Sequence, residues 1–304
     1  MNREAAGEGA PLSGWVGLGL VEAVNRAASW LEGEGVISPR LNAEALLSES
    51  TGLSRVELYV HYQRPLRRRE AEAFLSLLLR RLAHEPLQYI LGRRGFRRLE
   101  LEVDPRVLIP RPETELLVER ALQKMAEDPS LEVVLDLGTG SGNIALAVAQ
   151  ENPAATVIAT DVSPGALAVA ERNAARNGLA GRVRFLGGDL FAALPAELRG
   201  GIHLLLSNPP YVSAKDYGEL PPEVRDFEPP AALRSDGAGT LFHLRILDGA
   251  RDWLAPGGWV ILEGGADQVP GLREEALKRG FGRVEALYDL NGLPRFLECA
   301  LPAS

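Results

Sequence analysis

Residues 133–142, with the sequence VVLDLGTGSG, decide the fold of this chain. The apolar run that ends at Asp136 predicts a buried strand, and residues 143–150 continue with helical spacing. A glycine-rich turn between a strand and a helix lets the backbone approach a ligand closely, and the helix N-terminus adds partial positive charge. The stretch therefore predicts a nucleotide-type site on an α/β unit.

The glycines alone leave the identity of the ligand open. Counted from Gly138, the last glycine of the dinucleotide pattern G-x-G-x-x-G falls on Asn143, so the pattern fails there. The segment Gly140-x-Gly142-x-x-Ala145 fits the same pattern loosely. Both a dinucleotide and S-adenosylmethionine stay compatible with this loop.

Strands and helices alternate from Leu131 to the C-terminus. The predicted strands cover residues 132–136, 156–161, 183–187, 202–207, 259–263, 283–289 and 295–300. This alternation predicts a doubly wound parallel sheet of seven strands with helices on both faces, a Rossmann-like α/β fold. Residues 290–294 are too few for a helical crossover, so we expect the last strand to run antiparallel to the strand before it.

The region before this alternation reads differently. Residues 1–13 are predicted to be a disordered tail, and residues 14–85 show helical periodicity in four segments, with Pro39 and Ser54 as start signals. Residues 86–112 are rich in β-formers and predict a hairpin that links the helical bundle to the α/β domain at 113–304.

Composition excludes several classes of protein. The chain has 304 residues, one cysteine and a formal charge of −8, which excludes a disulfide framework and fits a reducing, cytoplasmic location. No apolar run is long enough for a membrane span, and the four histidines show no metal-ligand spacing, so we expect no metal. Residues 55–111 hold 13 Arg and Lys against 7 Asp and Glu, which predicts either a solvated face or an acidic partner.

Acidic residues close the first three predicted strands of the α/β domain. Asp136 can order the glycine loop and face a ligand's amino group, and Asp161 stands where an acid holds ribose hydroxyls. Asp189 can hold an adenine amino group while Leu190 or Phe191 packs against the ring. A single strand-end acid is often a helix cap. Three in succession beside a glycine loop favour a nucleoside site.

The fourth predicted strand ends in Asn208-Pro209-Pro210-Tyr211. The two prolines restrict the backbone and form a stiff elbow. Such an elbow holds the Asn208 side chain and nearby carbonyls in one geometry beside an aromatic ring. This arrangement suits the binding of a planar NH2 group, which could belong to a base or to an amide.

Together these motifs resemble the HemK/PrmC family, which methylates the glutamine of the Gly-Gly-Gln motif in peptide-chain release factors. The resemblance covers about residues 86–297 and rests on the order and sequence of four segments. They are Pro86-x-Gln88-Tyr89-Ile90-x-Gly92, VLIPRPETE at 107–115, DLGTGSG at 136–142 and SNPPY at 207–211. The parallel sheet with an antiparallel last strand is also usual in S-adenosylmethionine methyltransferases.

The resemblance implies roles for individual residues. S-adenosylmethionine would contact Gly138, Thr139, Gly140, Ser141, Gly142, Asp161, Leu190 and Asn208, in addition to Asp136 and Asp189 above. Asn208, Pro209, Pro210 and Tyr211 would hold the substrate glutamine, and we place Arg111 and Glu113 of the RPETE segment with them. Asn208, Pro209 and Tyr211 would carry the catalysis.

The implied reaction uses orientation rather than a strong base. Asn208 Oδ1 and the Pro209 carbonyl would accept the two N–H groups of the glutamine amide and turn the nitrogen lone pair toward the methyl group. The implied partners are peptide-chain release factors, which would place the protein near the ribosome. We expect a monomer with no stable nucleic-acid complex, in which the helical region docks the protein substrate.

Three alternatives remain at the level of the sequence. A glutamine of a ribosomal protein could be the acceptor, and the same tetrapeptide occurs in enzymes that methylate exocyclic amines of DNA or RNA. The chain could also be a non-catalytic binding module with a relic site. The intact glycine loop and Asn208 argue against such a module, and no residue pattern supports a dehydrogenase.

Overall fold

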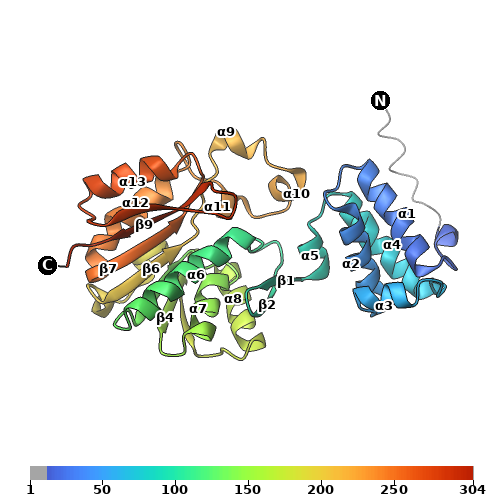
Figure 1. The fold of residues 1–304 in the computed structure, drawn as a ribbon, viewed down its shortest axis with the longest axis horizontal. Coiled ribbons are helices and arrows are strands. Elements are labelled where there is room, and N and C mark those ends of the chain that lie inside the picture. The colour runs from blue at the N-terminus through green and yellow to red at the C-terminus, as the bar shows by residue number, and fades with distance from the viewer. Residues whose placement is uncertain (1–11, 304) are drawn as a thin grey trace. The chain divides into compact units, whose positions relative to one another are not determined.

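A computed structural model describes residues 12–303. Residues 1–11, most of the predicted tail, lie outside the described residues. The chain divides into two compact units, Met1–Leu91 and Gly92–Ser304. Figure 1 shows the elements of both units.

The first unit is the predicted helical bundle. After a short 3-10 turn at Leu12–Gly14, its helices are α1 (Leu20–Gly33), α2 (Pro39–Thr51), α3 (Arg55–Val60), α4 (Arg68–Leu82) and α5 (Leu87–Leu91). Ser54 caps α3 as predicted: its side chain accepts a hydrogen bond from the Glu57 amide, and the Glu57 side chain accepts one from the Ser54 amide. Trp15 and Phe74 lie fully buried in the core of this unit.

The predicted hairpin needs two corrections. Strands β1 (Arg93–Phe96) and β2 (Leu99–Glu102) confirm it, but residues 89–91 are helical, and residues 107–109 form no strand. Leu87 and Ile90 of α5 pack into the core of the helical bundle, which overrides their β propensity. The hairpin itself packs Phe96 and Leu101 into the core of the second unit. The division of the chain therefore falls at Leu91, later than the predicted boundary at residue 85.

The second unit contains the predicted seven-stranded sheet. Its strands are β3 (Val133–Leu137), β4 (Thr156–Asp161), β5 (Val183–Gly187), β6 (Ile202–Ser207), β7 (Leu254–Glu263), β8 (Val284–Tyr288) and β9 (Pro294–Ala300). Their order is β5-β4-β3-β6-β7-β9-β8, and β9 runs antiparallel to both of its neighbours. The predicted fold class is confirmed, with the last strand inserted beside β7.

Helices cover both faces of the sheet. The long ones are α6 (Pro112–Glu127), α7 (Asn143–Glu151), α8 (Pro164–Arg176), α12 (Leu241–Trp253) and α13 (Val269–Lys278). Short helical turns lie at α9 (Ala214–Tyr217), α10 (Pro222–Arg225) and α11 (Pro230–Leu233), and 3-10 turns at Leu190–Ala193 and Ala196–Leu198. Within residues 12–303, no helix has the length and apolar character that a bilayer crossing requires.

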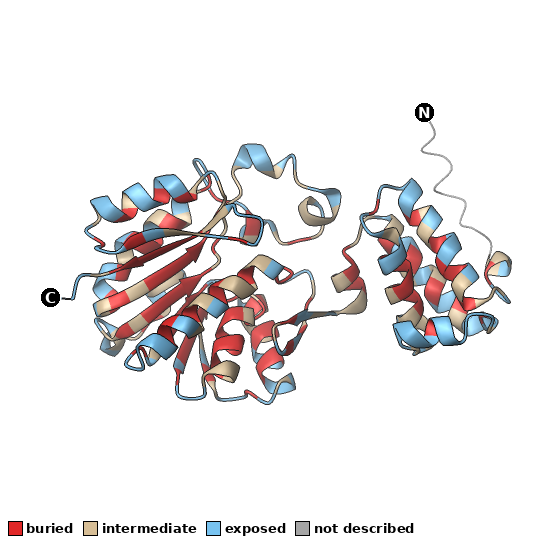
Figure 2. Cartoon of the chain, in the orientation of Figure 1, coloured by how far each residue is buried: buried red, intermediate tan, exposed pale blue. Residues whose placement is uncertain are grey.

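Side chains that alternate along the central strands form two hydrophobic cores, one on each face of the sheet. Leu204 and Leu206 of β6 belong to the cluster that includes α6 and α7, whereas Leu205 belongs to the cluster that includes α12 and α13. Figure 2 shows the central strands as almost continuously buried. A sheet buried on both faces presents its loops at the strand ends, where a ligand can reach them.

The buried face of β6 gives a test of this packing. Because Leu205 is fully buried, Leu205→Ala should lower the free energy of unfolding by about 2–5 kcal/mol. The matched change Leu290→Ala removes a side chain that is 91% exposed and should cost less than about 0.5 kcal/mol. Urea unfolding followed by circular dichroism measures both, and equal losses would contradict the two-core arrangement.

Candidate active site

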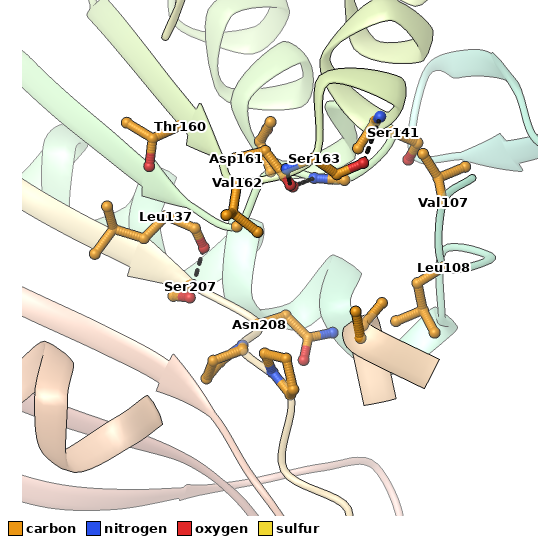
Figure 3. Close-up of a pocket in the computed structure, with 18 of the residues that line it drawn as sticks. Val107, Leu108, Leu137, Ser141, Thr160, Asp161, Val162, Ser163, Ser207 and Asn208 are labelled. Carbon is orange, nitrogen blue, oxygen red and sulfur yellow. Dashed lines mark hydrogen bonds between the residues drawn. The ribbon is translucent and has the colours of Figure 1, made fainter. Parts of the chain in front are cut away.

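The candidate site lies at the carboxyl ends of two neighbouring parallel strands. β3 pairs with β4 on one side and β6 on the other, so the strand order reverses between them. Ser207 at the end of β6 donates a hydrogen bond of 2.6 Å to the carbonyl of Leu137 at the end of β3. In open α/β sheets, ligands bind where the strand order reverses in this way. Figure 3 shows Asn208 and Asp161 on opposite sides of the resulting pocket.

The glycine loop after β3 has the backbone that the sequence predicts. Gly138, Gly140 and Gly142 have φ angles of 72°, 56° and 83°, a region that glycine enters readily. A Cβ atom at Gly138 or Gly140 would meet no atom within 4 Å, so both positions face open space. A Cβ atom at Gly142 would lie 3.0 Å from the Leu146 side chain. Gly142 therefore serves the packing of α7 and does not line the pocket.

Asp136 orders this loop from beneath. Its Oδ2 accepts hydrogen bonds from the Thr139 hydroxyl at 2.6 Å and from the Ala145 amide at 3.2 Å. Its Oδ1 is buried and has no partner among the described residues. Burial raises the pKa of Asp136 to about 7, and the two hydrogen bonds only partly offset this effect. Asp136 supports the loop and does not itself line the cavity.

Asp161 and Asp189 lie in different surroundings. Asp161 lines the cavity and accepts hydrogen bonds from the amides of Gly140 at 2.9 Å and Ser163 at 2.8 Å. A carboxylate offers about four lone-pair positions, so Asp161 can accept further donors from a ligand. Burial raises the pKa of Asp161, although these amides oppose the shift. Asp189 also lines the cavity, but its side chain is half exposed and pairs with Arg245 at 2.7 Å.

The two residues after Asp189 point to different places. Leu190 lines the cavity and has a φ of 50°, which is strained for a residue with a Cβ atom. Phe191 instead stacks on Trp253 and packs against the core. Of the two side chains predicted to cover an adenine ring, only Leu190 lies at the cavity.

Two neighbouring cavities meet at the start of the Asn-Pro-Pro-Tyr turn. The first, called the glycine-loop cavity, is lined by Gly138–Ser141, Asp161 and Leu190. The second, called the Tyr211 cavity, is lined by Tyr211 and by apolar residues between Leu220 and Leu233. Asn208 and Pro209 line both cavities. A group bound in one cavity can therefore approach a group bound in the other at these two residues.

A buried polar chain holds the Asn208 side chain. Its Nδ2 donates to the Thr114 hydroxyl oxygen at 3.2 Å, and the Thr114 hydroxyl donates to Glu263 Oε2 at 2.7 Å. Thr114 and Glu263 are each 1% exposed. Within residues 12–303, Asn208 Oδ1 and the Pro209 carbonyl accept no hydrogen bond. Both acceptors are thus available at the junction of the cavities.

The Tyr211 end of the turn is fixed separately. Gln268 donates hydrogen bonds to the carbonyls of Tyr211 at 2.8 Å and Ala238 at 3.0 Å. Gly239 lies so close that a Cβ atom there would be 2.3 Å from the Tyr211 carbonyl oxygen. Burial, and then the nearby charge of Glu263, raise the pKa of Tyr211 to about 12. Tyr211 is therefore a neutral phenol at physiological pH.

The RPETE segment at 111–115 contacts Asn208 through a residue that was not predicted. Arg111 lines both cavities, but its guanidinium pairs at 2.5 Å with Glu228, which is 2% exposed. Glu228 also accepts the Ile109 amide at 3.1 Å, so it clamps this segment. Glu113 lines neither cavity, whereas Thr114 lines the glycine-loop cavity. The site residue of this segment that contacts Asn208 is thus Thr114.

Thr114, Glu263 and Gln268 were not predicted as site residues. Glu263 carried a usable signal, because it closes an apolar strand just as Asp136 and Asp161 do. Thr114 and Gln268 carried none, since a threonine in the first turn of a helix or a glutamine just before a helix is common. Their partners are distant in sequence and could not be identified without the fold.

The burial of Asp136 predicts a pH dependence of stability. Its folded-state pKa of about 7 exceeds the ordinary value of 3.8, so the folded state binds more protons between these values and loses stability as the pH rises. Asp136→Asn removes this titration. Between about pH 5 and pH 8, the free energy of unfolding should therefore fall by on the order of 2 kcal/mol more in the wild type than in Asp136→Asn. Urea titrations measure this, and a difference that stays constant with pH would contradict it.

Comparisons with known proteins identify related families and a related fold. Residues 22–92 match the family model described as the PrmC N-terminal domain, and residues 112–220 match the methyltransferase small domain. The hMettl16 catalytic domain, solved in complex with a 3′UTR hairpin, superposes with a TM-score of 0.56 at 20% identity. That superposition covers 75% of this chain and 81% of hMettl16, and it supports the fold alone.

Sequence relatives cover nearly the whole chain. The release factor glutamine methyltransferase of Geobacter sulfurreducens is 41% identical over 276 residues, covering 90% of this chain and 94% of that protein. The protein of the same name from Chlorobaculum tepidum is 40% identical over 288 residues, covering 92% and 96%. With matches of this extent over both structural units, the chain belongs to the release factor glutamine methyltransferase family.

Proposed function

We propose that this protein transfers a methyl group from S-adenosylmethionine to the side-chain amide nitrogen of a glutamine in peptide-chain release factors. The observation that carries the proposal is the position of Asn208 and Pro209, which line both the glycine-loop cavity and the Tyr211 cavity. A methyl donor in the first cavity and an amide in the second would meet there. The printed names of the relatives support the choice of substrate.

The residues of the glycine-loop cavity fit S-adenosylmethionine. Gly138 and Gly140 face open space, Asp161 has acceptor positions left for ribose hydroxyls, and Leu190 offers an apolar surface for the adenine. When bound, this cofactor would supply a methyl group carried on a positively charged sulfur. As the methyl group is transferred to the amide nitrogen, the sulfur becomes a neutral thioether and the nitrogen releases a proton. We assign no metal to this chemistry.

The chain's own contribution at the acceptor is orientation. An amide nitrogen is a weak nucleophile because its lone pair is delocalised into the carbonyl. The Asn208 Oδ1 and the Pro209 carbonyl can accept its two N–H groups, which draws the nitrogen toward a tetrahedral shape and directs its lone pair out of the amide plane. Positioning of this kind contributes up to about 7–11 kcal/mol in favourable cases.

Among the residues that the structure describes, none at the acceptor site has a side chain suited to act as a strong base. Tyr211, with a pKa of about 12, stays protonated and provides a ring surface beside the amide. Its ring centroid lies 6.5 Å from that of His243, whose pKa burial lowers to about 4. His243 Nε2 contacts the Glu263 carbonyl at 2.8 Å, so the imidazole is engaged in the core. An amide that Asn208 and Pro209 hold in this orientation needs no such base, because its nitrogen loses a proton more easily once it is alkylated.

The alternative of a DNA or RNA methyltransferase rested mainly on the basic region at 55–111, and the structure weakens that support. Most arginines of the basic region at 55–111 form salt bridges with carboxylates. Examples are Arg64–Glu70, Arg68–Glu72, Arg80–Glu85 and Arg97–Glu151. A paired arginine offers less charge to a phosphate backbone than a free one. The basic region is thus better explained as a salt-bridged surface than as a nucleic-acid interface.

We further propose that the helical unit docks the protein substrate. Several large apolar side chains are exposed just before α2, on α3 and in the turn after α3, and an apolar surface of this kind can bind a partner. They are Ile37 at 72%, Val56 at 71%, Val60 at 65% and Tyr62 at 54%. A cytoplasmic monomer that meets release factors near the ribosome fits this surface and the single buried Cys299.

Asn208→Ala tests the proposed reaction directly. With purified release factor and labelled S-adenosylmethionine, this variant should lose about 100-fold or more in kcat because one of the two acceptors is gone. Its Kd for S-adenosylmethionine, measured by calorimetry, should stay close to that of the wild type. Asp161→Ala is the matched comparison and should weaken cofactor binding instead.

Substrate class is decided in the same assay. Release factor, ribosomal proteins and nucleic acid are offered separately to the wild type, and mass spectrometry locates the label on a glutamine. Label that enters nucleic acid, or an Asn208→Ala variant with wild-type turnover, would refute the proposed function.

The docking proposal predicts a change in binding of the protein substrate. Val56→Asp combined with Val60→Asp places two charges on the exposed face of α3. The Kd for intact release factor should rise by about tenfold or more, while the Kd for S-adenosylmethionine stays constant. Fluorescence anisotropy with labelled release factor measures the first constant. An unchanged Kd for the release factor would exclude this surface.

A further inference from the structure

Asn208 must present one particular end of its amide to the substrate. Its Oδ1 and Nδ2 have nearly the same shape, and a half-turn of the side-chain amide exchanges them. If Nδ2 faced the target amide nitrogen, two donors would oppose each other and the amide could not be held. The proposed function, on which this inference rests, therefore requires a device that selects one orientation.

Thr114 supplies the contact that distinguishes the two orientations. Its hydroxyl group can donate one hydrogen bond, and it donates that bond to Glu263 Oε2 at 2.7 Å. The Thr114 oxygen then has only lone pairs left for Asn208, at 3.2 Å. Only the Nδ2 end of the amide can complement them, which leaves Oδ1 directed away from Thr114.

We infer that Thr114 and Glu263 act as a positioning pair that fixes the orientation of the Asn208 amide, so that Oδ1 accepts the N–H of the substrate glutamine. The pair and Asn208 come from three separate parts of the chain. Thr114 lies in the first turn of α6, Glu263 ends β7, and Asn208 follows β6, the neighbour of β7. Glu263 lines neither cavity, and Thr114, which borders the glycine-loop cavity, acts here through its contact with Asn208.

The surroundings of Glu263 make the pair rigid. Its backbone lies in the sheet opposite Phe296 of β9, and its carbonyl oxygen receives the His243 Nε2 contact. Burial raises the pKa of Glu263 to about 7, while the Thr114 hydrogen bond opposes the shift. The ionised carboxylate has only acceptor oxygens, and a neutral carboxyl group still accepts the Thr114 hydrogen bond when its own proton lies on Oε1.

The test compares Thr114→Val with Thr114→Ser. Valine keeps the shape of threonine but has no hydroxyl, whereas serine keeps the hydroxyl and loses the methyl group. In Thr114→Val, kcat for release factor methylation should fall about tenfold, and the KM for S-adenosylmethionine should not change. Thr114→Ser should restore most of the wild-type kcat, which a purely structural role of the buried methyl would not allow.

A second readout does not depend on activity. In proton–nitrogen correlation spectra of the isotope-labelled protein, the two side-chain NH2 signals of Asn208 are identified by their loss in Asn208→Ala. We expect these signals to move in Thr114→Val and to stay in place in Thr114→Ser. Glu263→Gln, whose amide can itself donate a hydrogen bond to Thr114, should also move the Asn208 signals. This variant replaces Thr114→Val in the test if Thr114→Val does not fold.

The outcomes separate this inference from the proposed function. If the wild type does not methylate release factor, the proposed function fails, and the spectra still decide whether Thr114 orients Asn208. If the wild type is active, a Thr114→Val protein with wild-type kcat and unmoved Asn208 signals overturns the inference alone. Equal losses in Thr114→Val and Thr114→Ser would also overturn it.

Discussion

The adjacency of β3 and β6 is the constraint on which the site depends. Their parallel pairing aligns Asp136 with Leu206, and the hydrogen bond from Ser207 to the Leu137 carbonyl joins their carboxyl ends. Two loops that are distant in sequence, the glycine loop and the Asn-Pro-Pro-Tyr turn, must then begin side by side. Two cavities with shared lining residues follow from this single pairing.

Buried polar groups then decide what each loop can do. One carboxylate oxygen of Asp136 accepts hydrogen bonds from Thr139 and Ala145. Glu228 accepts hydrogen bonds from the Arg111 side chain and from the Ile109 amide. Such groups are costly to bury without partners, so their hydrogen bonds make the loops rigid. The acceptors at Asn208 and Pro209 stay open, and both residues line the two cavities. Rigid surroundings with a few open acceptors are what catalysis by orientation requires.

Much of the fold could be predicted because local and global preferences agree. The strands at 156–161, 183–187 and 202–207 were predicted at the bounds observed, since each is a short apolar run beside a turn. Residues 89–91 were wrongly assigned to an extended segment because Tyr89 and Ile90 favour strands locally. Packing of Ile90 into the helical bundle outweighs that preference. The side chain of Phe191 was ambiguous for a similar reason, as a core contact and a ligand contact look alike in sequence.

The sequence by itself determined the class of the protein and the two loops that carry its chemistry. Glycines at 138 and 140, the acid at 161 and the stiff turn at 208–211 predicted two loops that face ligands, and the family resemblance implied which ligands these are. Only the tertiary structure decided how Asn208 is oriented. Asn208, Thr114 and Glu263 come from three elements far apart in the chain, and a hydrogen bond needs its partners within about 3 Å. No local pattern encodes such a distance, because it exists only when the sheet and α6 have packed together.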